Sequence, residues 1–181
     1  MPEKHERIGR KLIHKGNIVE FHEDQILLPD GRQTTFDFIK HIGAAAIVPV
    51  TDDGKILMVK QYRNAIDAYT LEIPAGGRDS INEPTIDTAY RELEEETGYR
   101  TEKLVPLVSL NTTIAFCNEK IDIFLARNLI KSHQHLDDDE YIDVAAYEVE
   151  DLIEMIYDGR IVDAKTMVAI LAYKNAYLID K

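Results

Sequence analysis

Apolar, β-branched stretches separated by short polar turns predict strands through the first part of the chain. Residues 17–28 and 33–41 flank the turn sequence Pro29-Asp30-Gly31-Arg32, which predicts an antiparallel hairpin. The apolar run 43–50 is followed by Asp52-Asp53-Gly54 and by the strand-like residues 56–62, so we expect a second antiparallel pair there. Further strands are expected at 103–110 and 120–126.

Apolar residues recur three or four positions apart between Pro84 and Gly98, and this spacing predicts an amphipathic helix. Pro84 suits its first turn, and Gly98 suits the position just beyond its end. Two more helices are predicted at about 148–158 and 163–178, the first closed by Gly159. This order predicts an α/β fold, an α/β/α sandwich with a mixed sheet over residues 42–181, preceded by a small N-terminal antiparallel β element over residues 1–41.

The helix between Pro84 and Gly98 also carries a concentration of acidic side chains. Glu92, Glu95 and Glu96 fall on one stripe beside the apolar one, because positions three and four apart share a helix face. Residues 77–99 hold an excess of five negative charges. Such a cluster either stays in water as a solvated acidic face or binds a cation. Carboxylate oxygens suit hard divalent ions such as Mg²⁺, with Mn²⁺ as a substitute, and these ions also bind phosphates.

Composition narrows the possible partners. The chain has 181 residues, enough for one domain with a substantial core. Its net charge of −12 repels nucleic acid and anionic membranes, so we expect it to bind neither. The polar start, Met1 to Lys11, lacks the apolar core of a signal peptide, and a cytoplasmic location is therefore expected. A small anionic substrate would need a metal ion to offset the repulsion.

The acidic helix lies within a longer spaced motif. The chain reads Gly77, five residues, Glu83, seven residues, Arg91-Glu92-Leu93, one residue, Glu95-Glu96, one residue, Gly98-Tyr99. This resembles the signature of the Nudix hydrolases, with Tyr99 as the loose fit at the last apolar place. The resemblance implies hydrolysis of a nucleoside diphosphate linked to another group, with Glu92, Glu95 and Glu96 as metal ligands. Glu83 would support or join them, while Arg91 can pair with Glu95 one turn on and orient the cluster.

Three further segments resemble the ADP-ribose pyrophosphatase branch of that family: Gln61-Tyr62-Arg63, Leu71-Glu72-Ile73-Pro74-Ala75-Gly76 and Asp163-Ala164-Lys165-Thr166. The branch implies a homodimer formed through the N-terminal strands, and conversion of ADP-ribose to AMP and ribose 5-phosphate. Arg63 would contact the pyrophosphate, with Tyr62 and Gly77 as further substrate-binding residues. The chain carries Ile114-Ala115 where the branch has Pro-Gly, so GDP-mannose, another nucleotide sugar or a dinucleotide stays open as the substrate, as does a ligand-sensing domain without turnover.

Two roles are not assigned to one residue by the sequence. The carbonyl that completes the metal site belongs to Ala75 or Gly76, depending on how the loop before Glu83 is matched. The resemblance implies that the base for the attacking water is a glutamate of the motif or an acid of a later loop. The run Leu136-Asp137-Asp138-Asp139-Glu140 supplies candidates for the second, of which Glu140 is favoured and then Asp138. A solubilising acidic loop is the alternative reading of that run.

Overall fold

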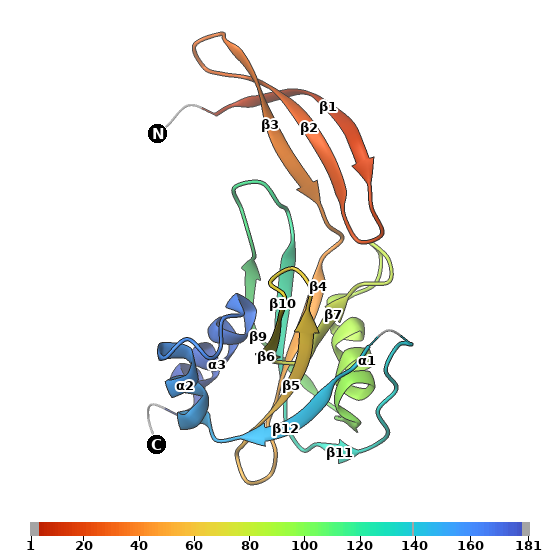
Figure 1. The fold of residues 1–181 in the computed structure, drawn as a ribbon, viewed down its shortest axis with the longest axis vertical. Helices are drawn as coiled ribbons and strands as arrows, with labels where there is room; N and C mark the ends of the chain where they lie inside the picture. The colour runs from red at the N-terminus through yellow and green to blue at the C-terminus, as the bar shows by residue number, and fades with distance from the viewer. Residues whose placement is uncertain (1–3, 139, 179–181) are drawn as a thin grey trace. The chain divides into compact units, whose positions relative to one another are not determined.

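Figure 1 shows the chain as a computed structural model, in which residues 4–138 and 140–178 are described. The chain divides into two compact units. Unit 1 comprises residues 1–43 and 111–120, and unit 2 comprises residues 44–110 and 121–181. Unit 1 therefore combines the N-terminal segment with a segment that is distant from it in sequence.

Unit 1 contains an antiparallel sheet of three strands in the order β1 (Glu6–Lys15), β2 (Glu20–Leu27) and β3 (Gln33–Lys40). The hairpin predicted between residues 17 and 41 is confirmed by the β2–β3 pairing. Its turn uses Gly31 at a φ of 84°, a left-handed conformation that glycine adopts at little cost. β1 was not predicted, because half of its side chains are charged and nearly all are exposed. Its backbone pairing with β2 holds it in place.

Unit 2 is built on a mixed sheet of four strands, and one of its two inner strands is buried on both faces. The strands follow the order β7 (Ala75–Gly77), β4 (Ala44–Pro49), β10 (Lys120–Ala126) and β9 (Leu104–Asn111). β10 runs parallel to β4, and β7 runs antiparallel to it. Every residue of β4 is buried, which explains why it reads as a continuous apolar run in the sequence. The strands predicted at 103–110 and 120–126 are confirmed.

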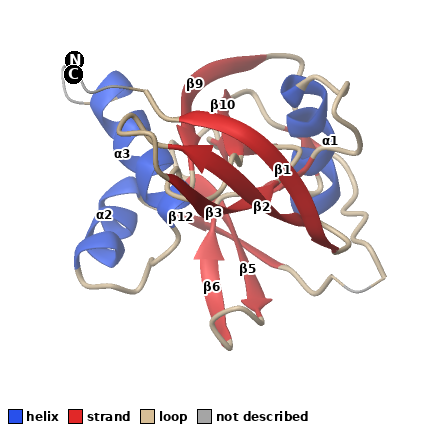
Figure 2. Cartoon of the chain, turned by 90° about the horizontal axis from the view of Figure 1, so that it is seen from above, coloured by secondary structure: helices blue, strands red, loops and turns tan. Residues whose placement is uncertain are grey.

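Helices cover both faces of this sheet, as Figures 1 and 2 show. Ala45 and Ile47 of β4 form one apolar cluster with Leu93 of α1 (Thr85–Thr97). The alternate residues Ala46 and Val48 join a second cluster with residues of α2 (Val149–Tyr157) and α3 (Ala164–Tyr177). The alternation along one strand thus supplies both cores, because successive side chains point to opposite faces. The predicted α/β/α sandwich with a mixed sheet is confirmed.

The expected antiparallel pairing of residues 43–50 with 56–62 is wrong. Both strands exist, but β5 (Ile56–Arg63) lies in a separate antiparallel sheet, between β12 (Asp143–Tyr147) and β6 (Ala68–Glu72). Only an isolated bridge between Val50 and Ile56 joins the two segments. β10 pairs with β4 along one edge, from Ala44 to Pro49, and β7 pairs with Ala44–Ala46 on the other edge. β5 therefore meets the run at its end, through Val50.

The three predicted helices are confirmed, and their ends follow local sequence signals. Gly98 ends α1 at a φ of 70°, and its N–H donates to the carbonyl of Glu94 at 2.9 Å. Pro84 stands at the N-cap of α1, one position before the first turn. Short strands β8 (Tyr99–Arg100) and β11 (Ile130–Lys131) pair beyond that helix. Within the described residues, no helix has the length and apolarity needed to span a membrane.

Candidate active site

Helix α1 presents two of the three predicted metal-binding glutamates to the interior of unit 2. Glu92 is 8% exposed and Glu96 is 2% exposed. Glu95 is more open, with 37% of its side chain exposed. The carboxylate of Glu96 accepts a hydrogen bond from the backbone N–H of Ala75 at 2.9 Å, which ties the helix to β7. The three acids therefore share a region of the helix, but they occupy different environments.

Arg91 holds the acidic cluster together. Its Nη1 donates to Glu92 at 2.6 Å and to Glu95 at 2.9 Å, and its Nη2 donates to the carbonyl of Gly77 at 2.9 Å. The predicted pairing of Arg91 with Glu95 is confirmed. The guanidinium also bonds Gly77, so the glycine turn and the helix are joined through one side chain. Gly77 thus contacts Arg91 through its carbonyl, and its predicted contact with substrate stays a prediction.

The turn before α1 brings Gly76 and Glu83 close to the same cluster. A Cβ added to Gly76 would lie 2.0 Å from Oε1 of Glu92, so only glycine leaves room for that carboxylate. Glu83 accepts a hydrogen bond from the N–H of Asp79 at 2.5 Å, and its other oxygen lies 3.9 Å from Nε of Arg91. Both backbone carbonyls considered as ligands, those of Ala75 and Gly76, belong to β7, which pairs with β4.

Burial perturbs the ionisation of the two interior glutamates. Burial raises the pKa of Glu92 to about 7 against the opposing effect of Arg91. Burial, reinforced by the charge of Glu92, raises the pKa of Glu96 to about 8. Two acids that resist ionisation near neutral pH form a site where a cation or a proton is stabilising.

The donor set fits a hard divalent cation. The carboxylate of Glu92 lies beside Gly76, and that of Glu96 accepts from the N–H of Ala75. Oxygen is the ligand that Mg²⁺ and Mn²⁺ prefer. No three His, Cys, Asp or Glu side chains among residues 4–138 and 140–178 form a ready-made metal cage. In this conformation Glu92 and Glu95 accept hydrogen bonds from Arg91 instead. The assignment of metal ligands therefore stays a prediction.

The predicted base lies close enough to the buried acids to affect them. The charge of Glu140 raises the pKa of both Glu92 and Glu96. Its loop is anchored to α1, since Gln134 donates from Nε2 to the carbonyl of Glu96 at 2.7 Å. A second anchor is the N–H of His135, which donates to the carbonyl of Glu95 at 3.0 Å.

The neighbouring acids of that run are placed differently. Asp137 bonds Glu140 through backbone and side chain, with its N–H 3.3 Å from the Glu140 carboxylate. Asp138 is exposed, and Asp139 lies outside the described residues. Of the acids considered as a base, Glu140 thus has an electrostatic link to the buried glutamates, and its role stays a prediction.

The predicted substrate-binding residues of β5 make contacts of their own. Tyr62 donates from its hydroxyl to Asp67, and its ring meets that of Tyr69 edge-on at 5.6 Å. Arg63 donates from Nε and Nη2 to the two oxygens of Glu72, at 2.8 and 2.7 Å. Arg63 is therefore paired with a buried acid and is not an isolated surface arginine.

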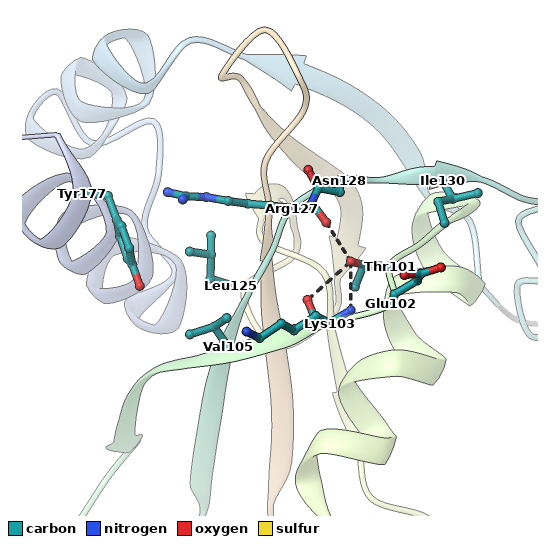
Figure 3. A pocket seen from close by; sticks show the side chains of 9 residues that line it. All are labelled: Thr101, Glu102, Lys103, Val105, Leu125, Arg127, Asn128, Ile130 and Tyr177. Atoms are coloured by element: carbon teal, nitrogen blue, oxygen red, sulfur yellow. Dashed lines mark hydrogen bonds between the residues drawn. The ribbon is translucent and has the colours of Figure 1, made fainter.

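One cavity of unit 2 lies apart from these residues. It has a volume of about 650 Å³ and is lined by residues from the start of β9, the end of β10 and the end of α3 (Figure 3). Arg127 lies over the ring of Tyr177 there, with 4.7 Å between the guanidinium carbon and the ring centroid. None of the predicted site residues lines this cavity.

Comparison with known proteins decides the family. The model of the NUDIX domain matches residues 40–169. The chain belongs to the Nudix family. The matched range contains the whole acidic motif, from Gly77 to Gly98, and the loop that carries Glu140.

Relatives within the Nudix family are similar over almost the whole chain. The ADP-ribose pyrophosphatase of Bacillus subtilis is 37% identical, with 96% of each chain covered. The methanol dehydrogenase activator of Bacillus methanolicus is 36% identical, with 90% of this chain and 89% of the relative covered. A crystal structure of an ADP compounds hydrolase matches 97% of this chain and 95% of its own, with a TM-score of 0.85. The sequences are 18% identical, so this likeness shows a shared fold.

Two buried residues of this Nudix domain were not among the predicted site residues. Glu72 is 2% exposed, and Lys165 is 9% exposed and donates from Nζ to the Glu72 carboxylate. Both lie in segments that resemble the ADP-ribose pyrophosphatase branch, and this resemblance was the sequence feature that could have pointed to them. Their contact joins residues 93 positions apart, so no periodic pattern could have revealed it.

Proposed function

We propose that this Nudix protein hydrolyses the diphosphate bond of a nucleoside diphosphate sugar, ADP-ribose above all, to AMP and ribose 5-phosphate, with Mg²⁺ as the metal ion. The observation that carries the proposal is the pair of buried glutamates on α1, Glu92 beside Gly76 and Glu96 on the N–H of Ala75, whose pKa values are raised to about 7 and about 8. The similarity to an ADP-ribose pyrophosphatase over 96% of both chains supports the choice of substrate.

The metal ion would be held by carboxylates and one backbone carbonyl. Glu92, Glu95 and Glu96 are the side-chain ligands in this proposal, Glu83 supports them, and the carbonyl belongs to Ala75 or Gly76. When bound, a divalent ion screens the diphosphate and makes a water easier to deprotonate. Mn²⁺ would serve as a substitute, because it has the same preference for oxygen ligands.

The protein's own residues would orient the substrate and take up the proton. Arg63 contacts the diphosphate, because its planar guanidinium suits paired phosphate oxygens, while Tyr62 and Gly77 border the substrate. Glu140 accepts the proton of the attacking water, with Asp138 as the second candidate. The electrostatic effect of Glu140 on both buried glutamates supports this assignment.

The proposal includes a homodimer formed through residues 1–41, with a nucleoside pocket that borrows residues from the partner. The sheet of unit 1 exposes apolar side chains, among them Leu12, Ile13 and Phe36, each close to half exposed. Exposed apolar side chains of this kind are what an interface buries. Sedimentation of the full chain tests this, and a mass of one 20.7 kDa protomer would contradict it. A cytoplasmic location belongs to the same proposal.

One assay tests the substrate. The chain is incubated with Mg²⁺ and ADP-ribose, GDP-mannose, UDP-glucose, NADH or a diadenosine polyphosphate, and phosphate released by added phosphatase is measured. Phosphatase acts on the monoester products and not on the intact diphosphates, so release reports cleavage. Turnover of ADP-ribose well above the others is expected, and faster turnover of another substrate would redirect the proposal to that compound.

Matched variants separate the metal site from general damage. Glu95→Gln combined with Glu96→Gln removes two proposed ligands and is expected to lower kcat at least about a hundredfold. Glu102→Gln, at an exposed position beyond the helix, makes the same chemical change and should leave turnover unchanged. Full activity in the double variant would refute the metal assignment. Tight binding of one ligand without turnover in the unaltered chain would favour a sensor.

A further inference from the structure

Arg63 is held by one edge of its guanidinium. Its Nε and Nη2 bond the two carboxylate oxygens of Glu72, at 2.8 and 2.7 Å. Its Nη1 makes no hydrogen bond to any residue that the structure describes, and 41% of the side chain is exposed. A guanidinium fixed in this way presents its remaining N–H donors in one direction, ready for a phosphate oxygen.

The partner of Arg63 is an acid that needs charge compensation. Glu72 is 2% exposed, and it accepts a further hydrogen bond from the hydroxyl of Thr70 at 2.6 Å. Burial by itself raises the pKa of Glu72, but Arg63 and Lys165 outweigh that effect and hold it at about 2. The carboxylate is therefore ionised and stays available as an anchor for Arg63.

Lys165 reaches this acid from a different part of the fold. It stands in the first turn of α3, whereas Arg63 and Glu72 belong to β5 and β6. Its Nζ donates to Glu72 and, at 3.0 Å, to Asp163, which also caps the helix by accepting from the N–H of Thr166. The helix start thus sets the position of the ammonium group, and the ammonium group sets that of the carboxylate.

A buried network of this kind is a poor source of net stability. Desolvation of the charges offsets most of their attraction, and apolar replacements of similar volume are often neutral or stabilising. Its distinctive property is geometric, because two cations and two acids from separate elements fix one another's orientation. The functional consequence falls on the one member that is substantially exposed, which is Arg63.

We propose that Lys165 is a positioning residue for substrate binding, which acts through Glu72 to fix Arg63 so that its Nη1 edge meets the diphosphate. The inference rests on the proposed function, in which Arg63 contacts that diphosphate. Lys165 itself touches no substrate atom. The contact made by Arg63 exists in both the bound state and the transition state, so its loss raises KM more than it lowers kcat.

Steady-state kinetics with ADP-ribose and Mg²⁺ test the proposal. Lys165→Met keeps the length of the side chain and removes its charge, and it should raise KM roughly tenfold with kcat within about twofold. Lys165→Arg keeps a cation and should keep KM within about threefold of the original. Lys174→Met makes the same change in the last turn of the same helix and should have no effect. A fall in kcat at unchanged KM for Lys165→Met would overturn the proposal.

A double-mutant cycle shows whether Lys165 acts through Arg63. In an Arg63→Gln background, Lys165→Met should change KM by less than about twofold, because the group that it positions is already absent. An equal increase of KM in both backgrounds would overturn the proposal. If Lys165→Met does not fold, the pair Glu72→Gln with Lys165→Met removes both buried charges and should raise KM in the same way.

A measurement without turnover separates failure of this inference from failure of the proposed function. The Nε–H NMR signal of Arg63 in the ligand-free protein should be sharp and protected from solvent exchange, since it donates to Glu72 at 2.8 Å. It should broaden or vanish in Lys165→Met and persist in Lys165→Arg. A signal unchanged by Lys165→Met overturns the positioning role, whatever the substrate is. If the signal is lost in Lys165→Met but the unaltered protein leaves ADP-ribose intact, the error lies in the proposed function alone.

Discussion

Raising the pH of the metal-free protein from about 5 to about 8.5 is expected to lower its free energy of unfolding, because two buried glutamates must ionise. Glu92 and Glu96 have pKa values of about 7 and about 8 in the folded chain, against 4.5 for an ordinary glutamate. Between pH 4.5 and these raised pKa values, the folded state keeps protons on the two glutamates that the unfolded state has lost. Stability is therefore highest at the low end of this range and is lost as the pH rises through 7 and 8.

The magnitude follows from the same numbers. Ionising Glu92 within the fold costs on the order of 3 kcal/mol over this pH range, and Glu96 costs somewhat more. The repulsion between the two charges contributes to the raised pKa of Glu96, so the two costs are not independent and cannot simply be added. We expect a total loss of about 3 to 5 kcal/mol in the free energy of unfolding. Glu72 does not oppose the trend, since its pKa of about 2 affects stability only at more acidic pH.

Urea unfolding in the presence of a chelator measures this loss. Glu96→Gln removes one ionisation and should make the metal-free protein more stable at about pH 8.5 by 2 kcal/mol or more, with little change at about pH 5. The exposed Glu102→Gln is the matched control. Adding Mg²⁺ at the higher pH should restore stability to the unaltered chain and much less to Glu96→Gln. A free energy of unfolding that stays level or rises from pH 5 to 8.5 would refute the reasoning.

Three further changes test other parts of the structure. Gly76→Ala places a Cβ 2.0 Å from the Glu92 carboxylate, so the Glu92 side chain must move. Turnover should fall more than about a hundredfold while the chain stays folded, and normal turnover would contradict this contact. Asp163→Ala removes the cap of α3 and should lower the free energy of unfolding by about 1 to 2 kcal/mol in urea titrations, and no change would argue against that cap. Leu93→Ala opens a cavity at a fully buried position and should cost about 2 to 5 kcal/mol, with a smaller loss indicating that the site collapses.

Several features of the site could be predicted because their causes are local. The spacing of apolar residues in α1 places Ala89 and Leu93 on its buried face, and the same spacing groups Glu92, Glu95 and Glu96. The contact between Arg91 and Glu95 follows from a separation of four residues on a helix. The left-handed Gly98 follows from the need to end that helix.

Strand pairing could not be predicted in the same way. The run 43–50 was correctly predicted as a strand, but its partners are β10 and β7, which come from distant parts of the chain. A short polar turn indicates only that two strands can pair, whereas the choice of partner depends on how many edges each strand has and which faces must be buried.

The helices, six of the twelve described strands and the acidic motif could be predicted from the sequence, because each depends on residues within a turn or two of one another. The burial of Glu92 and Glu96, the openness of Glu95 and the contact of Lys165 with Glu72 across 93 positions could be seen only in the folded chain. Burial and long-range pairing depend on the packing of separate elements, and packing sets the dielectric around each charge. The pKa values that make this site suited to a cation are therefore a property of the fold.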